Sequence, residues 1–436
     1  MSELSERVEG VLAGTCWSAG AAALAEQLGG RADVAEAIVA LSPAPFTGLV
    51  RACASNLDAA RFLSHRRSLA ERLREVGAEW PTQRVAELDS DSAPSGAGAD
   101  LEGFLDDLRL LRRDETLLAA MLDFGGTVPF AAISVLLSAV AEAITRRALI
   151  AACESLESNP PPLTVVALGK LGGREFTYES DLDIIFLHDG PTAGLATSSR
   201  VAQRLISYVS TLTGAGLGYR VDARLRPSGR QGTLVTSLPA FERYQREEAA
   251  VWEHLALVRA RAIAGPIETA ERALETLRGQ VLGRPEWTAI ADMRRRVEAE
   301  RGRDDGQHIP LKTGAGGLMD AEFLAQGAAL ELGLDRAQTP LPTVPLLLRA
   351  VGGEAAEKPI EAYLRLRKVE SRARWIFRRP VEQLDRQGAR FPEIAELCEP
   401  GWTPETLEHQ VADARTTLRT AFTAVIDAGT ARALGR

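Results

Sequence analysis

The sequence predicts a mostly helical protein with a small α/β unit set between two helical regions. Apolar residues recur at helical spacing from Glu3 to about Val85, from Leu101 to about Leu156, and from Pro266 to the end of the chain. Between the last two regions, short runs of branched apolar residues are typical of buried strands. Aromatic residues make up only 5% of the chain, whereas alanine, leucine and arginine abound, which also favours helices.

The chain of 436 residues is long enough for two to four domains at ~100–200 residues per domain. We expect an N-terminal helical region at 1–88, a linker or exposed loop at 89–100, a central domain at 101–270 and a C-terminal helical bundle at 271–436. The linker is small and polar and contains proline and glycine, which disfavour regular structure. The prolines at 160–162 end the helix before the first strand, because proline cannot continue a helix.

Bulk composition excludes several classes of protein. The chain is 45% hydrophobic and 25% charged, as in ordinary soluble globular proteins, and its net charge of −8 argues against a general nucleic-acid binder. The four cysteines lie far apart, without disulfide or zinc spacing, so we expect a reducing cytoplasm. We expect no membrane partner, because the most apolar stretch, Val128 to Ile144, is short for a span and contains Glu142.

The central domain should contain three strands. The apolar run Leu163–Leu168 and the run Asp181–Leu187 are joined by a glycine-rich connection, Gly169–Tyr178. A helix over Ser198–Thr213 then precedes an alternating run, Tyr219–Arg226, which predicts the third strand.

Two carboxylates on the second strand are the first candidates for chemistry. Side chains alternate along a strand, so Asp181 and Asp183 should share one face while Leu182, Ile184 and Phe186 face the core. Neighbouring carboxylates repel unless cations neutralise them, and magnesium prefers such oxygen ligands while keeping phosphate oxygens in its other positions. The alternative is a solvated strand end, where acidic residues are common.

A third carboxylate and two arginines follow on the predicted third strand. Asp222, Arg224 and Arg226 alternate with apolar residues, which predicts one shared face suited to a metal and a triphosphate. The turn residues Pro227–Gly229 follow at once and indicate a tight functional loop. The alternative is an exposed strand face with an internal ion pair.

The connection Gly169–Gly173 could bring backbone N–H groups close to phosphate, with Lys170 adding a charge. It is not a P-loop, because Leu171 stands where Ser or Thr would follow the lysine. A kinase or a dehydrogenase is therefore disfavoured.

Five ordered motifs resemble those of the glutamine synthetase adenylyltransferases, also known as adenylyl-removing enzymes. They are Gly169–Asp183, Asp222–Gly229, Phe241–Arg246, Trp252–Arg261 and Leu311–Phe323. The family has a polymerase-β-like nucleotidyltransferase fold, so the resemblance implies an α+β, mostly helical protein whose 101–270 domain holds a mixed sheet. It also implies that Mg²⁺ (or Mn²⁺) is held by the acids at 181, 183 and 222, and that ATP is the substrate. The residues expected to bind the nucleotide are Gly169, Lys170, Gly172, Gly173, Ser180, Arg224 and Arg226.

The function that the resemblance implies is transfer of AMP from ATP to a tyrosine of glutamine synthetase, which regulates nitrogen assimilation. Glutamine synthetase is the expected partner, and a nitrogen-signalling regulatory protein is a conceivable second one. Two alternatives stay open: phosphorolytic removal of AMP from adenylylated glutamine synthetase, and a regulatory module without turnover. The intact acid trio argues against the regulatory module.

The sequence departs from the family in one respect. The family's usual enzyme has two similar nucleotidyltransferase halves, whereas one complete motif set occurs here. The motifs Arg224–Gly229 and Trp252–His254 are closer to the transferase half, while Ser55–Leu63 resembles the start of the other half. A fragment and a single-headed enzyme are both compatible with this pattern.

Two further charged segments have both a functional and a structural interpretation. The segment Trp252–Arg261 could approach the nucleotide, or it could form an ion-paired helix face. The basic helix Arg365–Arg379 could contact an acidic partner, although a solvated face wrapped on a core is the commoner case.

Overall fold

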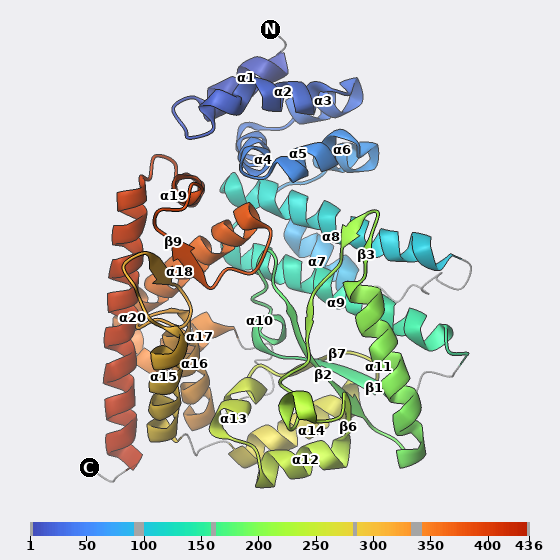
Figure 1. Cartoon of the computed structure of the whole chain (residues 1–436), viewed down its shortest axis with the longest axis vertical. Coiled ribbons are helices and arrows are strands. Elements are labelled where there is room, and N and C mark those ends of the chain that lie inside the picture. The colour runs from blue at the N-terminus through green and yellow to red at the C-terminus, as the bar shows by residue number, and fades with distance from the viewer. Residues whose placement is uncertain (1–2, 91–99, 158–162, 282–285, 333–341, 434–436) are drawn as a thin grey trace.

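The computed structural model describes residues 3–90, 100–157, 163–281, 286–332 and 342–433. It confirms a mostly helical α+β protein with one small mixed sheet (Figure 1). Most of the linker expected at 89–100 lies outside the described residues. None of the helices in the described ranges is both long and apolar enough to cross a membrane.

Short helices make up the N-terminal region, and α1 to α6 lie at the top of Figure 1. They are α1 (Glu3–Leu12), η1 (Ser18–Gly20), α2 (Ala21–Gly29), α3 (Ala32–Val39), α4 (Pro43–Ser55), α5 (Leu57–Ser64), α6 (Arg67–Leu73) and α7 (Trp80–Asp89).

Two long helices connect this region to the sheet. Helix α8 (Leu101–Phe124) packs against α4, and α9 (Phe130–Glu154) packs against α7 and α8. The side chain of Asp100 accepts a hydrogen bond from the backbone N–H of Gly103 (2.9 Å), which caps the start of α8. Glu142, the charge inside the most apolar stretch, lies buried on α9 and pairs with Arg174 and Arg261.

The sheet has the strand order β5-β2-β1-β7, and β6 also pairs with β2. Its strands are β1 (Leu163–Ala167), β2 (Leu182–His188), β5 (Val221–Asp222), β6 (Val235–Ser237) and β7 (Arg261–Ala264). Strand β1 runs antiparallel to β2 and β7, whereas β2 runs parallel to β5 and β6. The sheet is therefore mixed, as expected.

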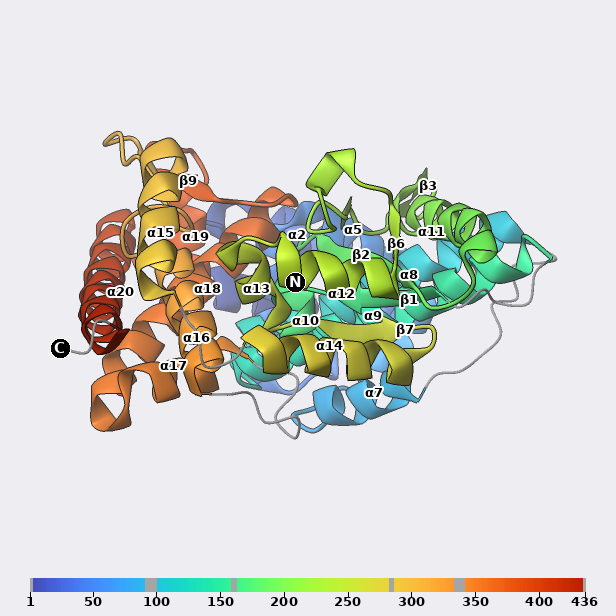
Figure 2. The same ribbon diagram turned by 90° about the horizontal axis from the view of Figure 1, so that it is seen from below.

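Short elements connect the strands and cover the sheet. They are α10 (Gly169–Gly172), η2 (Thr192–Gly194), α11 (Leu195–Ser210), β3 (Leu212–Thr213), β4 (Gly216–Leu217), η3 (Gly229–Gln231), α12 (Leu238–Glu247), α13 (Val251–Leu257) and α14 (Ile267–Val281). Seen from below, α12 and α14 lie across one side of the sheet and α9 across the other (Figure 2).

Both faces of β2 are buried, because the sheet lies between two layers of helices. Leu182, Ile184 and Phe186 belong to the large core that includes α9 and α11, as the sequence predicted. Ile185 and Leu187 belong to a smaller core with α12, α13 and α14. Since side chains alternate along a strand, Asp183 belongs to the face of this smaller core.

The C-terminal region is a helical bundle with one short two-stranded sheet, in which β8 and β9 pair antiparallel. Helix α20 packs along α15, α16 and α18, at the left of Figure 1. The elements are α15 (Trp287–Arg301), β8 (His308–Pro310), α16 (Leu318–Leu332), α17 (Thr343–Val351), η5 (Gly353–Ala356), α18 (Glu357–Phe377), β9 (Gln383–Asp385), α19 (Phe391–Cys398) and α20 (Pro404–Ala433).

The third predicted strand is much shorter than expected. Strand β5 ends at Asp222, and the chain from Ala223 to Ser228 forms turns instead of continuing the alternation to Arg226. Its parallel partner β2 pairs with it only through Leu182 and Asp183, and farther along β2 pairs with β6. The prediction of one strand face for Asp222, Arg224 and Arg226 is therefore wrong.

Candidate active site

Two of the predicted acids meet on neighbouring strands. Asp183 on β2 and Asp222 on β5 are directly paired Cα partners in the parallel register. The backbone of Asp183 is fixed on its other side, where its carbonyl accepts a hydrogen bond from the N–H of Leu168 (2.8 Å). The fold thus brings together two carboxylates that are 39 residues apart in the sequence.

The backbone of Gly169 lies against the carboxylate of Asp183. A Cβ at position 169 would lie 2.6 Å from Oδ2 of Asp183, and the residue has a φ of +53°. Both facts favour glycine, because side chains rarely adopt this backbone conformation and none would fit this space. Gly169 therefore gives the backbone close access to the acidic strand.

Burial raises the pKa of Asp183 to about 6. The charges of Lys312 and Lys170 act in the opposite direction, and those of Asp222 and Asp181 add to the rise. Lys312 comes from the C-terminal region, just after β8. Three segments outside β2 thus contribute charge near Asp183, through Lys170, Asp222 and Lys312. The motif Leu311–Phe323 was the sequence signal for this segment, but nothing in it showed that Lys312 approaches the acids.

The other two acids are paired with arginines. Arg220 Nε donates to Asp181 Oδ1 (3.1 Å), immediately before β2 begins. Arg224 donates to both carboxylate oxygens of Asp222 from the turn after β5, and this hydrogen bonding lowers the pKa of Asp222. The alternative of an internal ion pair is thus realised at Asp222 and Arg224, in a turn instead of on a strand face.

Arg226 points into its own loop. Its guanidinium donates to the carbonyls of Ala223 (2.6 Å), Gly232 (3.3 Å) and Arg230 (3.4 Å). These bonds close the turn after β5, and they leave Arg224, whose side chain is 61% exposed, as the more available cation.

The glycine-rich connection forms a short helix, α10, that packs tightly. A Cβ at Gly172 would lie 2.0 Å from the carbonyl oxygen of Arg259, so this glycine permits close backbone packing. Gly173 is buried, and its N–H bonds to the carbonyl of Gly169 (3.2 Å). The two glycines at 172 and 173 therefore have structural roles beside the expected one.

Lys170 and Ser180 both contact helix α18. Lys170 Nζ lies 2.7 Å from Oε1 of the buried Glu370, and Ser180 Oγ bonds to Thr177 (2.9 Å) and accepts from Arg374 (3.4 Å). The C-terminal bundle thus holds the connection on which the nucleotide-binding residues are expected. Sequence patterns within either segment do not show this contact.

Most of the segment Trp252–Arg261 forms structural contacts. Glu253 accepts a hydrogen bond from the hydroxyl of Tyr244 (2.9 Å), and Arg259 pairs with Glu175 (3.1 Å). His254 bonds to a backbone carbonyl, and Trp252 is 41% exposed. The ion-paired interpretation holds for Arg259, whereas Glu253 and His254 form hydrogen bonds and Trp252 is exposed.

The acids have the chemistry that a hard divalent cation prefers, since all their donors are oxygens. Asp183 and Asp222 are in register, and Asp181 lies two residues from Asp183. Within the described residues, no group of three or more His, Cys, Asp or Glu side chains is arranged to hold a metal ion. Asp181 and Asp222 instead contact Arg220 and Arg224 in this arrangement.

Two family models match the chain. The model described as glutamate-ammonia ligase adenylyltransferase matches residues 49–276, slightly more than half of the chain. The model described as GlnD PII-uridylyltransferase matches residues 291–426, which form the C-terminal helical region.

Curated relatives named bifunctional glutamine synthetase adenylyltransferase/adenylyl-removing enzyme are similar to this chain. The one from Thioalkalivibrio sulfidiphilus is 34% identical over 332 residues, covering 68% of this chain and 34% of the relative. Those from Rhodopseudomonas palustris and Xanthobacter autotrophicus are 40% and 37% identical, over 55% and 66% of this chain. The chain spans about a third or less of the length of these relatives.

The first model includes β2, β5 and both connections that carry the predicted site. Its match over more than half of the residues shows the family to which the sequence motifs pointed. The chain belongs to the glutamate-ammonia ligase (glutamine synthetase) adenylyltransferase family.

Proposed function

We propose that this protein transfers AMP from ATP to a tyrosine hydroxyl of glutamine synthetase. The observation that carries the proposal is the register of Asp183 and Asp222 on adjacent parallel strands, inside the segment that matches the family model. Burial leaves the first of these acids in need of a positive counter-charge, which a divalent cation would supply.

The metal ion proposed for this site is Mg²⁺ or Mn²⁺, held by Asp181, Asp183 and Asp222. When bound, it would neutralise phosphate charge and orient the α-phosphate for displacement of pyrophosphate. The remaining work belongs to the chain itself, as positioning and charge compensation around the phosphates.

The nucleotide-binding side chains would act from the two connections that flank the acids. Gly169 keeps the backbone close to Asp183, and Arg224 is an exposed cation already beside Asp222. The ammonium of Lys170 pairs with Glu370 on α18 (2.7 Å). We assign these three residues, together with Gly172, Gly173, Ser180 and Arg226, to the binding of the triphosphate or to the shape of its loops.

The direction of the reaction is proposed from the motifs Arg224–Gly229 and Trp252–His254, which resemble the transferase half of the family. The relatives named above are described as bifunctional, and this chain spans only part of their length, so phosphorolytic removal of AMP is the second candidate. We also propose the cytoplasm as the compartment, which the wide spacing of the four cysteines along the sequence supports. A nitrogen-signalling regulatory protein is the proposed effector, and the uridylyltransferase match of residues 291–426 supports such a link.

Two incubations test the proposal. Unmodified glutamine synthetase with ATP and Mg²⁺ should gain an adenylyl mass, measured by intact-protein mass spectrometry, and pyrophosphate should appear. Adenylylated glutamine synthetase with phosphate should release little ADP. Rapid ADP release without forward transfer would reverse the assigned direction, and activity in neither incubation would reject glutamine synthetase as the substrate of this chain.

A further inference from the structure

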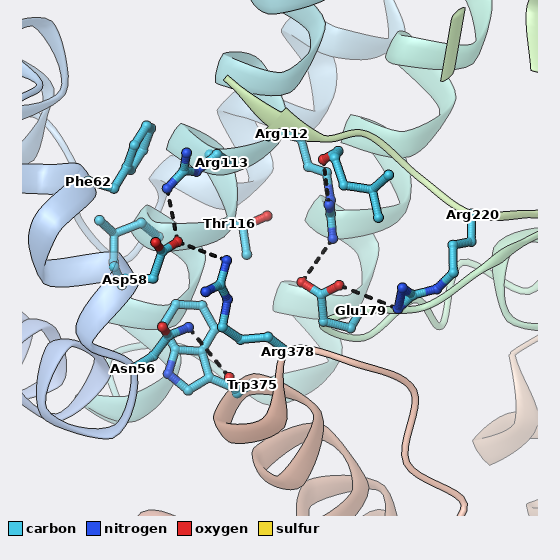
Figure 3. A pocket seen from close by; sticks show the side chains of 14 residues that line it. Asn56, Asp58, Phe62, Arg112, Arg113, Thr116, Glu179, Arg220, Trp375 and Arg378 are labelled. Atoms are coloured by element: carbon cyan, nitrogen blue, oxygen red, sulfur yellow. Dashed lines mark hydrogen bonds and ion pairs between the residues drawn. The ribbon is translucent and has the colours of Figure 1, made fainter. Parts of the chain in front are cut away.

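A charged cavity lies between the N-terminal helices and the predicted active site. Its volume is about 380 Å³, within the range of pockets that bind small molecules. Five segments meet there: α5, the middle of α8, the loop before β2, β4 with the loop after it, and the end of α18 (Figure 3).

Arginines dominate the lining of this cavity. Arg112, Arg113, Arg220 and Arg378 line it together with two acids, Asp58 and Glu179. An arrangement of four guanidinium groups with five donors each is suited to carboxylate or phosphate recognition.

The first acid, Asp58, is shared by two of these arginines. Arg113 Nη2 and Arg378 Nη2 lie 3.0 Å and 2.9 Å from the same oxygen, Oδ2 of Asp58. Burial and the charges of Arg378 and Arg112 lower the pKa of Arg113 from its ordinary value. One carboxylate therefore compensates two guanidinium groups incompletely.

The second acid, Glu179, lies on the other side of Thr116 in the view of Figure 3. Its carboxylate is 3.0 Å from Arg112 and 3.9 Å from Arg220. Arg220 also reaches Asp181 (3.1 Å), so this side of the cavity borders the predicted acid trio.

Two of these charged residues have unusual backbone conformations. Glu179 has a φ of 49° and Arg378 a φ of 54°, and both are among five non-glycine residues with positive φ in the described ranges. Arg378 is the C-cap residue of α18, where a left-handed conformation commonly ends a helix. Glu179 adopts it in the loop before β2.

Apolar side chains form the remaining wall. Phe62, Leu117 and Trp375 line the cavity, and the guanidinium of Arg113 lies 3.9 Å from the centre of the Phe62 ring. A ligand would thus meet both guanidinium groups and apolar side chains in this cavity.

We infer that this cavity binds a small organic dianion, with carboxylate or phosphate groups at Arg113 and Arg378 and an apolar body against Phe62 and Trp375. The site would lie beside the predicted active site and be separate from it. Arg220 lines the same cavity and pairs with Asp181, so the second carboxylate of a dicarboxylate ligand would draw Arg220 away from Asp181, and dicarboxylate binding and metal binding should favour each other. This coupling, unlike the anion site itself, rests on the proposed function.

Calorimetric titration of the whole chain, without divalent cations, tests the anion site. Phenyl phosphate and phthalate serve as phosphate and dicarboxylate probes, and neutral phthalamide is the control. At least one dianion should bind, and phthalamide should not. Arg113→Gln and Arg378→Gln should each weaken binding by roughly tenfold or more, as expected for a lost charge-assisted bond. Arg379→Gln, an exposed neighbour outside the cavity, should bind as the wild type does.

Asp58→Asn provides a test that unfolding cannot imitate. Because it releases two arginines, this change should tighten dianion binding. Arg224→Gln, at the predicted active site, should leave the affinity unchanged. Absence of binding by both dianions, equal losses in Arg379→Gln, or a loss confined to Arg224→Gln would each overturn the inference.

The coupling has its own readout. Mn²⁺ affinity, measured by electron paramagnetic resonance, should rise when phthalate is present in the wild type and not in Arg113→Gln. An equal rise in both proteins, or no rise, would overturn the coupling. Failure of Mn²⁺ to bind at all would reject the proposed metal site and leave the anion site standing on the calorimetry.

Discussion

Helix α18 and the strand pair β2–β5 both carry several charged side chains, but they differ in whether the carboxylates are paired with cations. On α18, the carboxylate of Glu370 is 1% exposed and lies 2.7 Å from Lys170, 2.7 Å from Arg367 and 2.9 Å from Arg374. Burial alone would raise the pKa of Glu370, yet these three cations hold it below its usual range. The charge is fully compensated within the protein.

At the strand edge, Asp183 has no such compensation. No described arginine or lysine forms an ion pair with its carboxylate, and its nearest strand partner is another acid, Asp222. The difference shows that a cluster of charged side chains does not by itself indicate a binding or catalytic site. A buried acid that lacks its counter-ion is the better indicator, because a ligand can supply it.

The largest effect is expected from replacing the unpaired acid on β2. Asp183→Asn should lower nucleotidyl transfer by at least about a thousandfold, the upper range for removal of one preorganised electrostatic group. The thermal midpoint should stay equal or rise, because repulsion with Asp222 is relieved. Asp181→Asn should act in the same direction. Asp189→Asn, exposed at the other end of β2, is the matched control and should be active. Substantial metal-dependent activity in Asp183→Asn would move the site elsewhere.

On α18 the opposite result is expected. Glu370→Gln leaves three buried cations without their carboxylate, so the free energy of unfolding should fall by about 3 kcal/mol, as when a buried ion pair is broken. Denaturant unfolding of the purified protein measures this loss. An unchanged midpoint would mean that the cations find other partners, and the contrast between the two segments would then fail.

Arg224 tests the strand edge again, with a smaller effect. Arg224→Ala should slow transfer or weaken ATP binding roughly ten- to hundredfold, since a charge-assisted bond is worth about 1.5–3 kcal/mol. Its exposure predicts an unchanged stability. Steady-state kinetics and a thermal scan give both quantities, and wild-type kinetics would assign this arginine to a solvated surface.

Arg226 differs from Arg224 because its donors are satisfied inside its own loop. Arg226→Ala should therefore lower stability by about 1–2 kcal/mol through lost hydrogen bonds to carbonyls. Transfer should fall only as far as the loop loosens. Proteolysis within Arg224–Gly232 would report that loosening, and a kinetic loss with an intact loop would give Arg226 a direct role instead.

The smallest effect is expected on the exposed side of α18. Lys368 lies 3.2 Å from Glu399, and both side chains are partly exposed. Exposed pairs contribute about 0–1 kcal/mol, so Lys368→Ala should change neither unfolding nor transfer measurably. A loss as large as that of Glu370→Gln would show that burial does not separate the two kinds of charge on this helix.

Local sequence patterns predicted which helices and strands form better than where each of them ends. The apolar runs gave β1 and β2 to within one residue, and the predicted helix Ser198–Thr213 appears as Leu195–Ser210. The third strand was predicted too long. Apolar and polar residues keep alternating after Asp222, but β2 pairs with β5 only up to Asp183 and then pairs with β6. Alternation is a property of one segment, whereas a strand requires a neighbour.

The basic helix shows the same limit for charge. The expectation of a solvated face is wrong for the arginines at 367, 372 and 374, which are all buried. Arg372 pairs with Asp123, 249 residues away in the chain, so its partner could not be found by spacing along α18. The helix and its apolar face were predictable, but its role in joining distant segments was not.

The sequence by itself determined the mostly helical class, the acidic strand and the family. These depend on periodicity and on motifs within about fifteen residues, where side-chain direction follows from local geometry. Only the tertiary structure decided that Glu370 holds Lys170, that Lys312 acts on Asp183, and that four arginines from distant segments line one cavity. Long, flexible cations find partners according to how helices dock, and docking depends on the whole core instead of on any one segment.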